Sequence, residues 1–204
     1  MKKIISTCLL VFSLLFANVS PAFAANHYGD AVYRDGVLDN LTWHAAINNY
    51  STVGWAVIEA PGGSGVVSSH TWNTFLTDGD GIVRNYQGPP QYKYGMTDND
   101  LNNVLYTARF LANQANVTYT PIDMMHGYTS MTYISPGSVS QLRCDGLVEY
   151  AYEWNNWDVL MDKNGNWDIS NKNSTPYHSS IWFTWTGNTF NPVTQWSYMD
   201  PHYD

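Results

Sequence analysis

The sequence predicts an α+β domain in which mostly antiparallel strands pack against a few helices. Two runs rich in β-branched and aromatic residues, at 41–48 and 53–60, are typical of neighbouring strands. A longer stretch at 98–115 has apolar residues at helical spacing, and a shorter helical pattern occupies 144–154. Together these patterns indicate an α+β fold whose antiparallel sheet contacts at least two helices.

The first 24 residues have the pattern of a secretory signal peptide. Lys2 and Lys3 form a positive start, residues 4–16 are mostly apolar, and residues 22–24 read Ala-Phe-Ala, a cleavage pattern. The alternative is a retained membrane anchor. No later stretch is apolar enough to span a bilayer. We therefore expect a secreted or cell-envelope protein whose residues 25–204 form a single domain, with no membrane span after cleavage.

The net charge and the aromatic content indicate which kinds of molecule the protein binds. The chain has a formal net charge of −8, which becomes more negative when two lysines leave with the signal peptide. This charge argues against nucleic acid and against anionic membrane surfaces. The aromatic content is 15%, which suits either a compact extracellular domain or a groove for sugars or peptides. A monomer is expected.

The segments around the two predicted strands and before the first helix have a less regular pattern of apolar residues. Residues 26–40 look polar and irregular, and a tight turn at 51–52 is expected to join the first two strands. The sequence PGGSG at 61–65 ends the second strand. Short strand-like runs alternate with turn residues over 66–95.

The helix at 98–115 has both a start signal and an apolar face. Thr97 and Asp100 have the spacing of a capping box. The apolar face consists of Leu101, Val104, Leu105, Ala108, Leu111, Ala112 and Ala115. Residues 117–140 are expected to be loop, and residues 155–204 to be loop with one or two short strands near 180–187.

Cysteine usage is the most informative feature. Cys8 leaves with the signal peptide, so Cys144 remains without an intramolecular partner. Such a thiol in an oxidising compartment is either buried and inert or used. Cys144 begins the helix at 144–154, where Ser138 or Ser140 could cap it. The unpaired N–H groups of a helix N-terminus stabilise a thiolate and an oxyanion. Arg143 adds positive charge there, and Asp145 opposes the thiolate.

A nucleophilic cysteine needs a histidine base and a group that orients the base. His44 lies inside the first strand, and Glu59 lies in an apolar part of the second, where an unpartnered carboxylate is costly. If Tyr50 faces Val53 across the turn, His44 and Glu59 lie directly opposite on one face. The alternative is a purely structural buried His–Glu pair.

The other histidines are weaker candidates for the base. His27 and His202 are near the ends of the expected domain, and His126 and His178 are in loop-like sequence. His70 is in a strand-like run. We therefore assign the base to His44.

These residues carry a family resemblance. "RCDGLVEYAYE" around Cys144 resembles the cysteine-helix motif of the NlpC-type cell-wall peptidases. The order of "WHAAI" at His44, "VIEAPGGSGV" at Glu59 and then Cys144 is similar to the circularly permuted, YiiX-like branch of papain-like amidases. The likeness spans roughly residues 41–154. Asp145 stands where a serine is usual, Gly146 replaces the usual glutamate of the permuted branch, and residues 155–204 match nothing.

The resemblance implies a permuted papain-like fold in which the sheet packs against the cysteine helix. It also implies a secreted cysteine amidase or peptidase with Cys144 as nucleophile, His44 as base and Glu59 as orienting group, acting on a peptide or amide of the cell envelope, such as one derived from peptidoglycan. No cofactor or metal is required. Two alternatives are a non-catalytic module that binds wall glycan or peptide, and an acyl or peptidyl transferase that uses the same thioester. The absence of an "NCEHF"-like motif disfavours the related acyltransferases.

Two further patterns have simpler interpretations. Acidic and amide residues at 162–168 are spaced like part of a calcium loop but lack its glycine and final glutamate, which favours a solvated turn. The aromatic stretch at 177–203 is either core or a wall of the substrate groove, and core packing is favoured.

Overall fold

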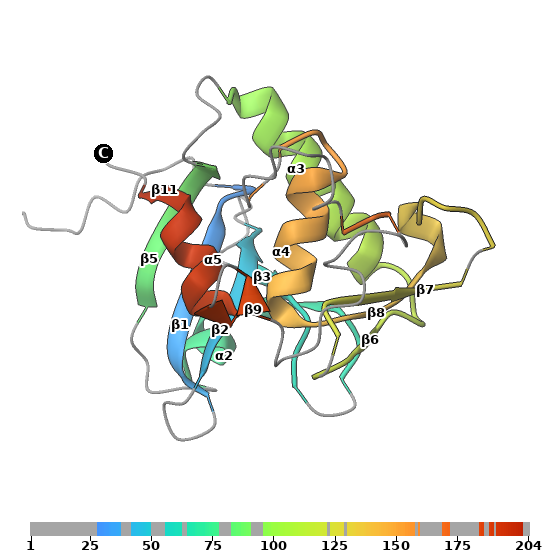
Figure 1. The fold of residues 1–204 in the computed structure, drawn as a ribbon. Helices are drawn as coiled ribbons and strands as arrows, with labels where there is room; N and C mark the ends of the chain where they lie inside the picture. The colour runs from blue at the N-terminus through green and yellow to red at the C-terminus, as the bar shows by residue number, and fades with distance from the viewer. Residues whose placement is uncertain are drawn as a thin grey trace, which may run out of the picture.

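The structure is a computed structural model that describes part of the chain. The described residues are 28–37, 42–49, 56–62, 65–77, 83–90, 96–121, 123–128, 130–157, 159, 169–171, 184–185, 188–189 and 191–201. Within them the fold is mixed α+β, with an antiparallel sheet and a few helices (Figure 1). The expected signal peptide at 1–24 and the calcium-like stretch at 162–168 lie outside the described residues.

The main sheet has six strands in the order β11-β5-β1-β2-β3-β4, and every neighbouring pair is antiparallel. Its strands are β1 (Ala31–Val37), β2 (Thr42–Asn48), β3 (Ala56–Glu59), β4 (Ser68–Thr71), β5 (Val83–Pro90) and β11 (Met199–Pro201). The expectation that residues 26–40 are irregular was wrong, because β1 pairs with both β2 and β5. Hydrogen bonds to a neighbouring strand on each side stabilise β1, although the polar residues around it do not predict a strand.

Smaller elements occupy segments that were expected to be loop. A three-stranded sheet has the order β6-β8-β7. It contains β6 (Thr118–Tyr119), β7 (Met125–Gly127) and β8 (Val139–Leu142). Its β6–β8 pair is parallel and its β7–β8 pair antiparallel. A hairpin of β9 (Thr184–Trp185) and β10 (Asn188–Thr189) lies further along the chain, and β9 falls within the short strand expected near 180–187. Strands of two to four residues are too short to show alternation, which explains why the sequence did not reveal β6, β7 or β8.

The predicted long helix is α3 (Asp98–Ala112), and its Thr97–Asp100 capping box is confirmed. It ends three residues before the expected boundary of 115, with Asn113 as C-cap, and Ala115 is exposed. The cysteine helix is α4 (Cys144–Glu153). Three helical segments were not expected: α2 (Trp72–Thr77), α5 (Pro192–Tyr198) and the 3₁₀ turn η1 (Pro136–Ser138).

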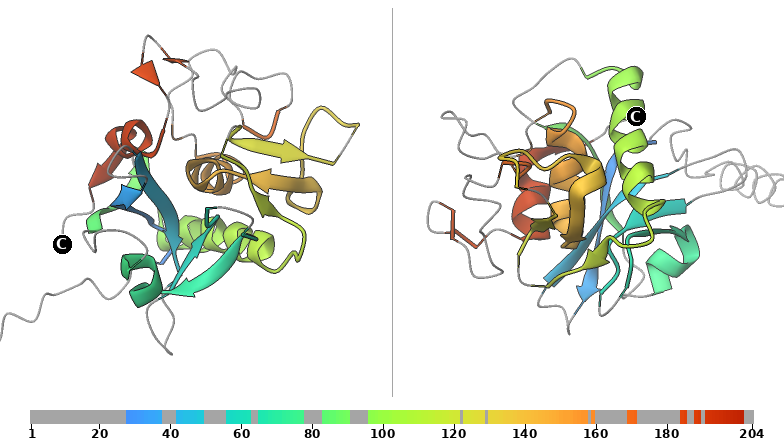
Figure 2. Two further views of the ribbon diagram at one scale, coloured as in Figure 1. Left: turned by 90° about the horizontal axis from the view of Figure 1, so that it is seen from below. Right: turned by 90° about the vertical axis from the view of Figure 1, so that its right-hand side faces the viewer.

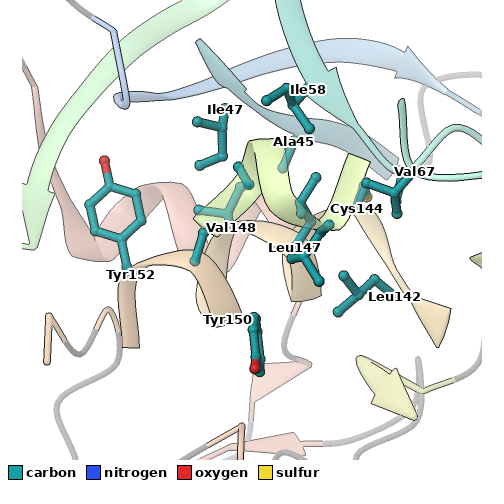
Figure 3. Packing of buried hydrophobic residues seen from close by; sticks show 14 of the residues in the cluster. Ala45, Ile47, Ile58, Val67, Leu142, Cys144, Leu147, Val148, Tyr150 and Tyr152 are labelled. Atoms are coloured by element: carbon teal, nitrogen blue, oxygen red, sulfur yellow. The ribbon is translucent and has the colours of Figure 1, made fainter. Parts of the chain in front are cut away.

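The two faces of the main sheet have different partners. Alternate residues Ala45 and Ile47 of β2 belong to the large core with α3 and α4, whereas Ala46 packs with Phe75 of α2 in a smaller cluster. Figure 2 accordingly shows α2 and α4 on opposite sides of the strands. In Figure 3, Leu147 and Val148 of α4 point toward the sheet. The core therefore fixes α4 against β2.

All ten residues of α4 are buried, although the sequence suggested an apolar stripe on one side. The expected end of that stripe, Trp154, is instead 39% exposed and stacks on Tyr150 with ring centroids 5.8 Å apart. None of the helices in the described ranges combines the length and apolar character needed to cross a bilayer.

Candidate active site

Cys144 is the first residue of α4, at the point where β8 leads into the helix (Figure 1). The N-cap is Arg143, whose side chain makes no capping hydrogen bond, so neither Ser138 nor Ser140 has the expected capping role. The N–H groups of a first helical turn lack intrahelical partners and favour an anion. The thiol therefore lies in a position suited to a thiolate.

A close backbone contact fixes the start of α4. The N–H of Arg143 donates to the carbonyl oxygen of Met124 over 3.0 Å. A Cβ added at Gly146 would lie 2.0 Å from that same oxygen. Any larger residue at 146 would push the helix away from the Met124 backbone. The structure thus gives a packing reason for a glycine at position 146.

The two charges that flank Cys144 pair with each other. Arg143 Nε donates to Asp145 Oδ1 over 2.6 Å, and its Nη2 donates to Oδ2 over 2.8 Å. Burial alone would lower the pKa of Arg143, but the Asp145 carboxylate outweighs it and raises that pKa. Arg143 and Asp145 therefore form a buried ion pair at the start of α4.

His44 and Glu59 lie on one face of the sheet and are in direct contact. His44 Nε2 is 2.6 Å from Glu59 Oε2, and the two residues are 5% and 1% exposed. Their predicted register was wrong by two residues, because Glu59 pairs with Ala46. The hydrogen bond from Asn49 N to Ala56 O continues this register, and the turn expected at 51–52 lies outside the described residues. A shift of two preserves the face, so the side chains meet diagonally.

Cys144 also acts on His44, because the charge of the thiol group and a side-chain hydrogen bond to it both raise the pKa of the imidazole. The recorded β2–β3 ladder ends at Ala46 and Glu59, so His44 lies beyond it, where β2 pairs with β1. Since Glu59 occupies Nε2, Nδ1 is the ring nitrogen left for the sulfur.

The electrostatics favour a protonated imidazole. Burial would lower the pKa of His44, but attraction and hydrogen bonding from Cys144, and then from Glu59, raise it to about 9. Burial would raise the pKa of Glu59, but the hydrogen bonds and charges of His44 and His70 lower it. At neutral pH the site therefore holds an ionised carboxylate beside an imidazolium.

The structure adds a second histidine that the sequence analysis set aside. His70 Nδ1 lies 2.5 Å from Glu59 Oε1, and its Nε2 lies 3.0 Å from Ser68 Oγ. Ser68 pairs with Glu59 across the β3–β4 ladder, and His70 is two residues further along β4. The sequence predicted a strand around His70, but it did not show that this strand lies beside β3, which carries Glu59.

The remaining histidines lie elsewhere. His126 of β7 pairs with Asp123 at 2.7 Å and is not the residue against Cys144. His27, His178 and His202 are outside the described residues. Among the described residues, no three His, Cys, Asp or Glu side chains are grouped to hold a metal ion.

The C-terminal aromatic segment contributes to packing beside the site where it is described. Trp196 of α5 meets Trp43, the neighbour of His44, edge to face at 5.3 Å. Buried Gln195 donates to the Asp145 carbonyl oxygen over 2.9 Å and to Glu149 over 2.6 Å. These contacts dock α5 onto α4, which fits the expectation of core packing for this part of the aromatic stretch.

Cys144 is 6% exposed, so only a small part of its surface meets solvent. A buried cysteine, imidazole and carboxylate joined in one hydrogen-bonded series can support acyl transfer through a thioester. The chain matches no family model, no curated protein and no solved structure at a significant level.

Proposed function

We propose that the protein is a secreted cysteine hydrolase that cleaves an amide bond. The observation that carries this proposal is the buried His44–Glu59 contact of 2.6 Å, together with Cys144 at the N-terminus of α4, which raises the pKa of the same imidazole. A purely structural His–Glu pair would not require a thiol beside the ring.

In this proposal Cys144 is the nucleophile. His44 holds the thiol proton as an imidazolium, and the Cys144 thiolate attacks the carbonyl carbon of the amide. The backbone N–H of Cys144 helps stabilise the oxyanion. His44 then protonates the leaving amine as the C–N bond breaks, which leaves a thioester. Water loses a proton to His44 and attacks the thioester, and the acid is released as the C–S bond breaks, which restores the thiolate–imidazolium pair. Glu59 holds the ring in one tautomer and orientation.

The fold and substrate class follow from the same proposal. The chain order of His44, Glu59 and Cys144, and the packing of α4 on an antiparallel sheet that carries the other two residues, support a circularly permuted papain-like domain. By that resemblance the substrate is a peptide or acyl amide of the cell envelope. Residues 1–24, as a signal peptide, would deliver the enzyme to that compartment.

The test combines thiol labelling with turnover. Iodoacetamide should label native Cys144 at pH 6–7, as identified by peptide mapping. Activity on a panel of cell-wall peptides and acyl amides should disappear in Cys144→Ala and fall severely in Cys144→Ser. Glu59→Gln should lose less than either, since an orienting group is partly dispensable. An unlabelled native thiol together with no activity on the panel would exclude the hydrolase.

A second function, glycan binding, has its own structural observation. A pocket of about 280 Å³ lies between α3, η1 and the end of α4. Tyr106, Phe110 and Trp154 line it and are 71%, 42% and 39% exposed. Asn103 and Asn155 also line it, and none of its lining residues is charged. Exposed aromatic rings beside amides suit a neutral sugar, whose C–H faces pack on rings while hydroxyls bond to amides.

This pocket is at the opposite end of α4 from Cys144, about 15 Å along the helix axis. Soluble chitin oligosaccharides should therefore quench tryptophan fluorescence equally in the wild type and in Cys144→Ala. Trp154→Ala and Tyr106→Ala should abolish binding, whereas Tyr128→Ala, a control at a tyrosine that is 69% exposed and does not line the pocket, should not. Binding that survives Tyr106→Ala would remove the glycan role from this pocket.

A further inference from the structure

The two carboxylate oxygens of Glu59 contact two different histidines. Its Oε2 contacts His44 Nε2 at 2.6 Å and its Oε1 contacts His70 Nδ1 at 2.5 Å. The carboxylate is 1% exposed, whereas the His70 side chain is 31% exposed. Each oxygen therefore has its own ring donor, and His70 connects the buried carboxylate to the surface.

The hydrogen bonds around His70 define its protonation state. Ser68 Oγ donates to the Val66 carbonyl oxygen over 3.0 Å, which uses its single proton. At the 3.0 Å contact between Ser68 Oγ and His70 Nε2, the ring must therefore donate. An ionised Glu59 only accepts, so Nδ1 donates as well. A ring that donates from both nitrogens is an imidazolium.

We propose that His70 is a positioning residue of this site: as an imidazolium held by Ser68, it fixes the Glu59 carboxylate so that Oε2 keeps His44 facing Cys144. The inference rests on the proposed function, because it assigns a role in preparing the thiol. With Cys144 as thiolate and His44 as imidazolium, the charges of Cys144, His44, Glu59 and His70 sum to zero. A neutral residue at 70 would remove the positive charge in direct contact with the buried Glu59 carboxylate.

The charged groups on the face of the sheet that carries His70 include buried Arg34, which lies opposite His44 on β1 and over the Phe75 ring. Glu59 of β3 is the direct partner of His70, and His44 and Cys144 follow through Glu59. The helix α2, packed against β4, has no titratable side chain. On α3, Arg109 donates to Asn49, which bonds Ser69, a neighbour of His70 on the other face of β4.

The experiment measures the alkylation rate of Cys144 in the full chain as a function of pH. His70→Leu removes donor and charge and should lower the plateau rate several-fold. Loss of a nearby positive charge makes proton release harder, so the acidic midpoint should rise by about one pH unit. His70→Asn keeps an N–H near the Nδ1 position without the charge, so it should restore the plateau rate while the midpoint stays raised.

The control is His126→Leu, which removes another partly exposed histidine with a carboxylate partner and should leave the profile unchanged. Nitrogen NMR of the wild-type ring should show both nitrogens of His70 protonated at neutral pH. Should His70→Leu fail to fold, His70→Asn decides alone. A folded variant with the wild-type profile would overturn the role of His70 while the hydrolase stands. A wild-type thiol that resists alkylation at every pH would instead overturn the proposed function.

Discussion

Replacing Gly146 by alanine should displace the cysteine helix. The new Cβ would lie 2.0 Å from the carbonyl oxygen of Met124, where an ordinary contact is 3.4–4 Å. Relief requires α4 and the Met124 backbone to separate by more than about 1 Å, and both partners are main chain. Overpacking of this kind costs about 1–3 kcal/mol. The hydrogen bond from Arg143 N to Met124 O would be strained or lost, at about 1 kcal/mol.

We therefore expect Gly146→Ala to lower the free energy of unfolding by about 2–4 kcal/mol in urea. The folded variant should also alkylate Cys144 more slowly, since the sulfur moves away from His44. The matched control is Gly137→Ala, because a Cβ there meets nothing within 4 Å; it should change stability by less than about 0.5 kcal/mol. If Gly146→Ala were as stable and as reactive as the control, the close approach of α4 to Met124 would be wrong.

Three other expectations concern the site and its supports. The pKa of His44 is raised from 6.5 to about 9. Protonated His44 therefore adds about 3 kcal/mol to the free energy of unfolding. This stabilisation is complete below pH 6.5 and is lost as the pH rises through 9. The stability advantage of wild type over His44→Gln in urea should shrink across that window, and a constant difference would contradict the assignment. Thr97→Ala should cost about 1 kcal/mol through loss of the α3 capping box, without altering Cys144 alkylation; a slower alkylation would link α3 to the site. Gln195→Leu should lower the free energy of unfolding in urea by about 2–4 kcal/mol, because buried Glu149 and the Tyr33 hydroxyl each lose a hydrogen-bond partner. Its control, Val193→Ala on the exposed side of α5, should be near neutral, and equal effects would argue against docking through Gln195.

Much of the candidate site is readable from residue types and local spacing. The apolar residues of α4 and the unusual glutamate in β3 point to a helix and to a buried carboxylate that needs a partner. The nomination of Cys144, His44 and Glu59 needs no long-range information beyond the turn between two strands. Even a register error of two residues leaves His44 and Glu59 in contact, since strand side chains alternate with period two.

Other parts of the site depend on segments that meet only in the folded chain. The position of β4 beside β3 brings His70 to Glu59, and a four-residue strand carries no pattern that names its neighbour. The approach of Met124 to Gly146 and the docking of α5 through Gln195 join residues 22 and 46 to 50 positions apart. Local sequence reports the period of an element and the chemistry of its side chains, because both arise within a few residues. Which elements touch is set by the packing of the whole core, so the second histidine and the reason for the glycine emerge only from the three-dimensional fold.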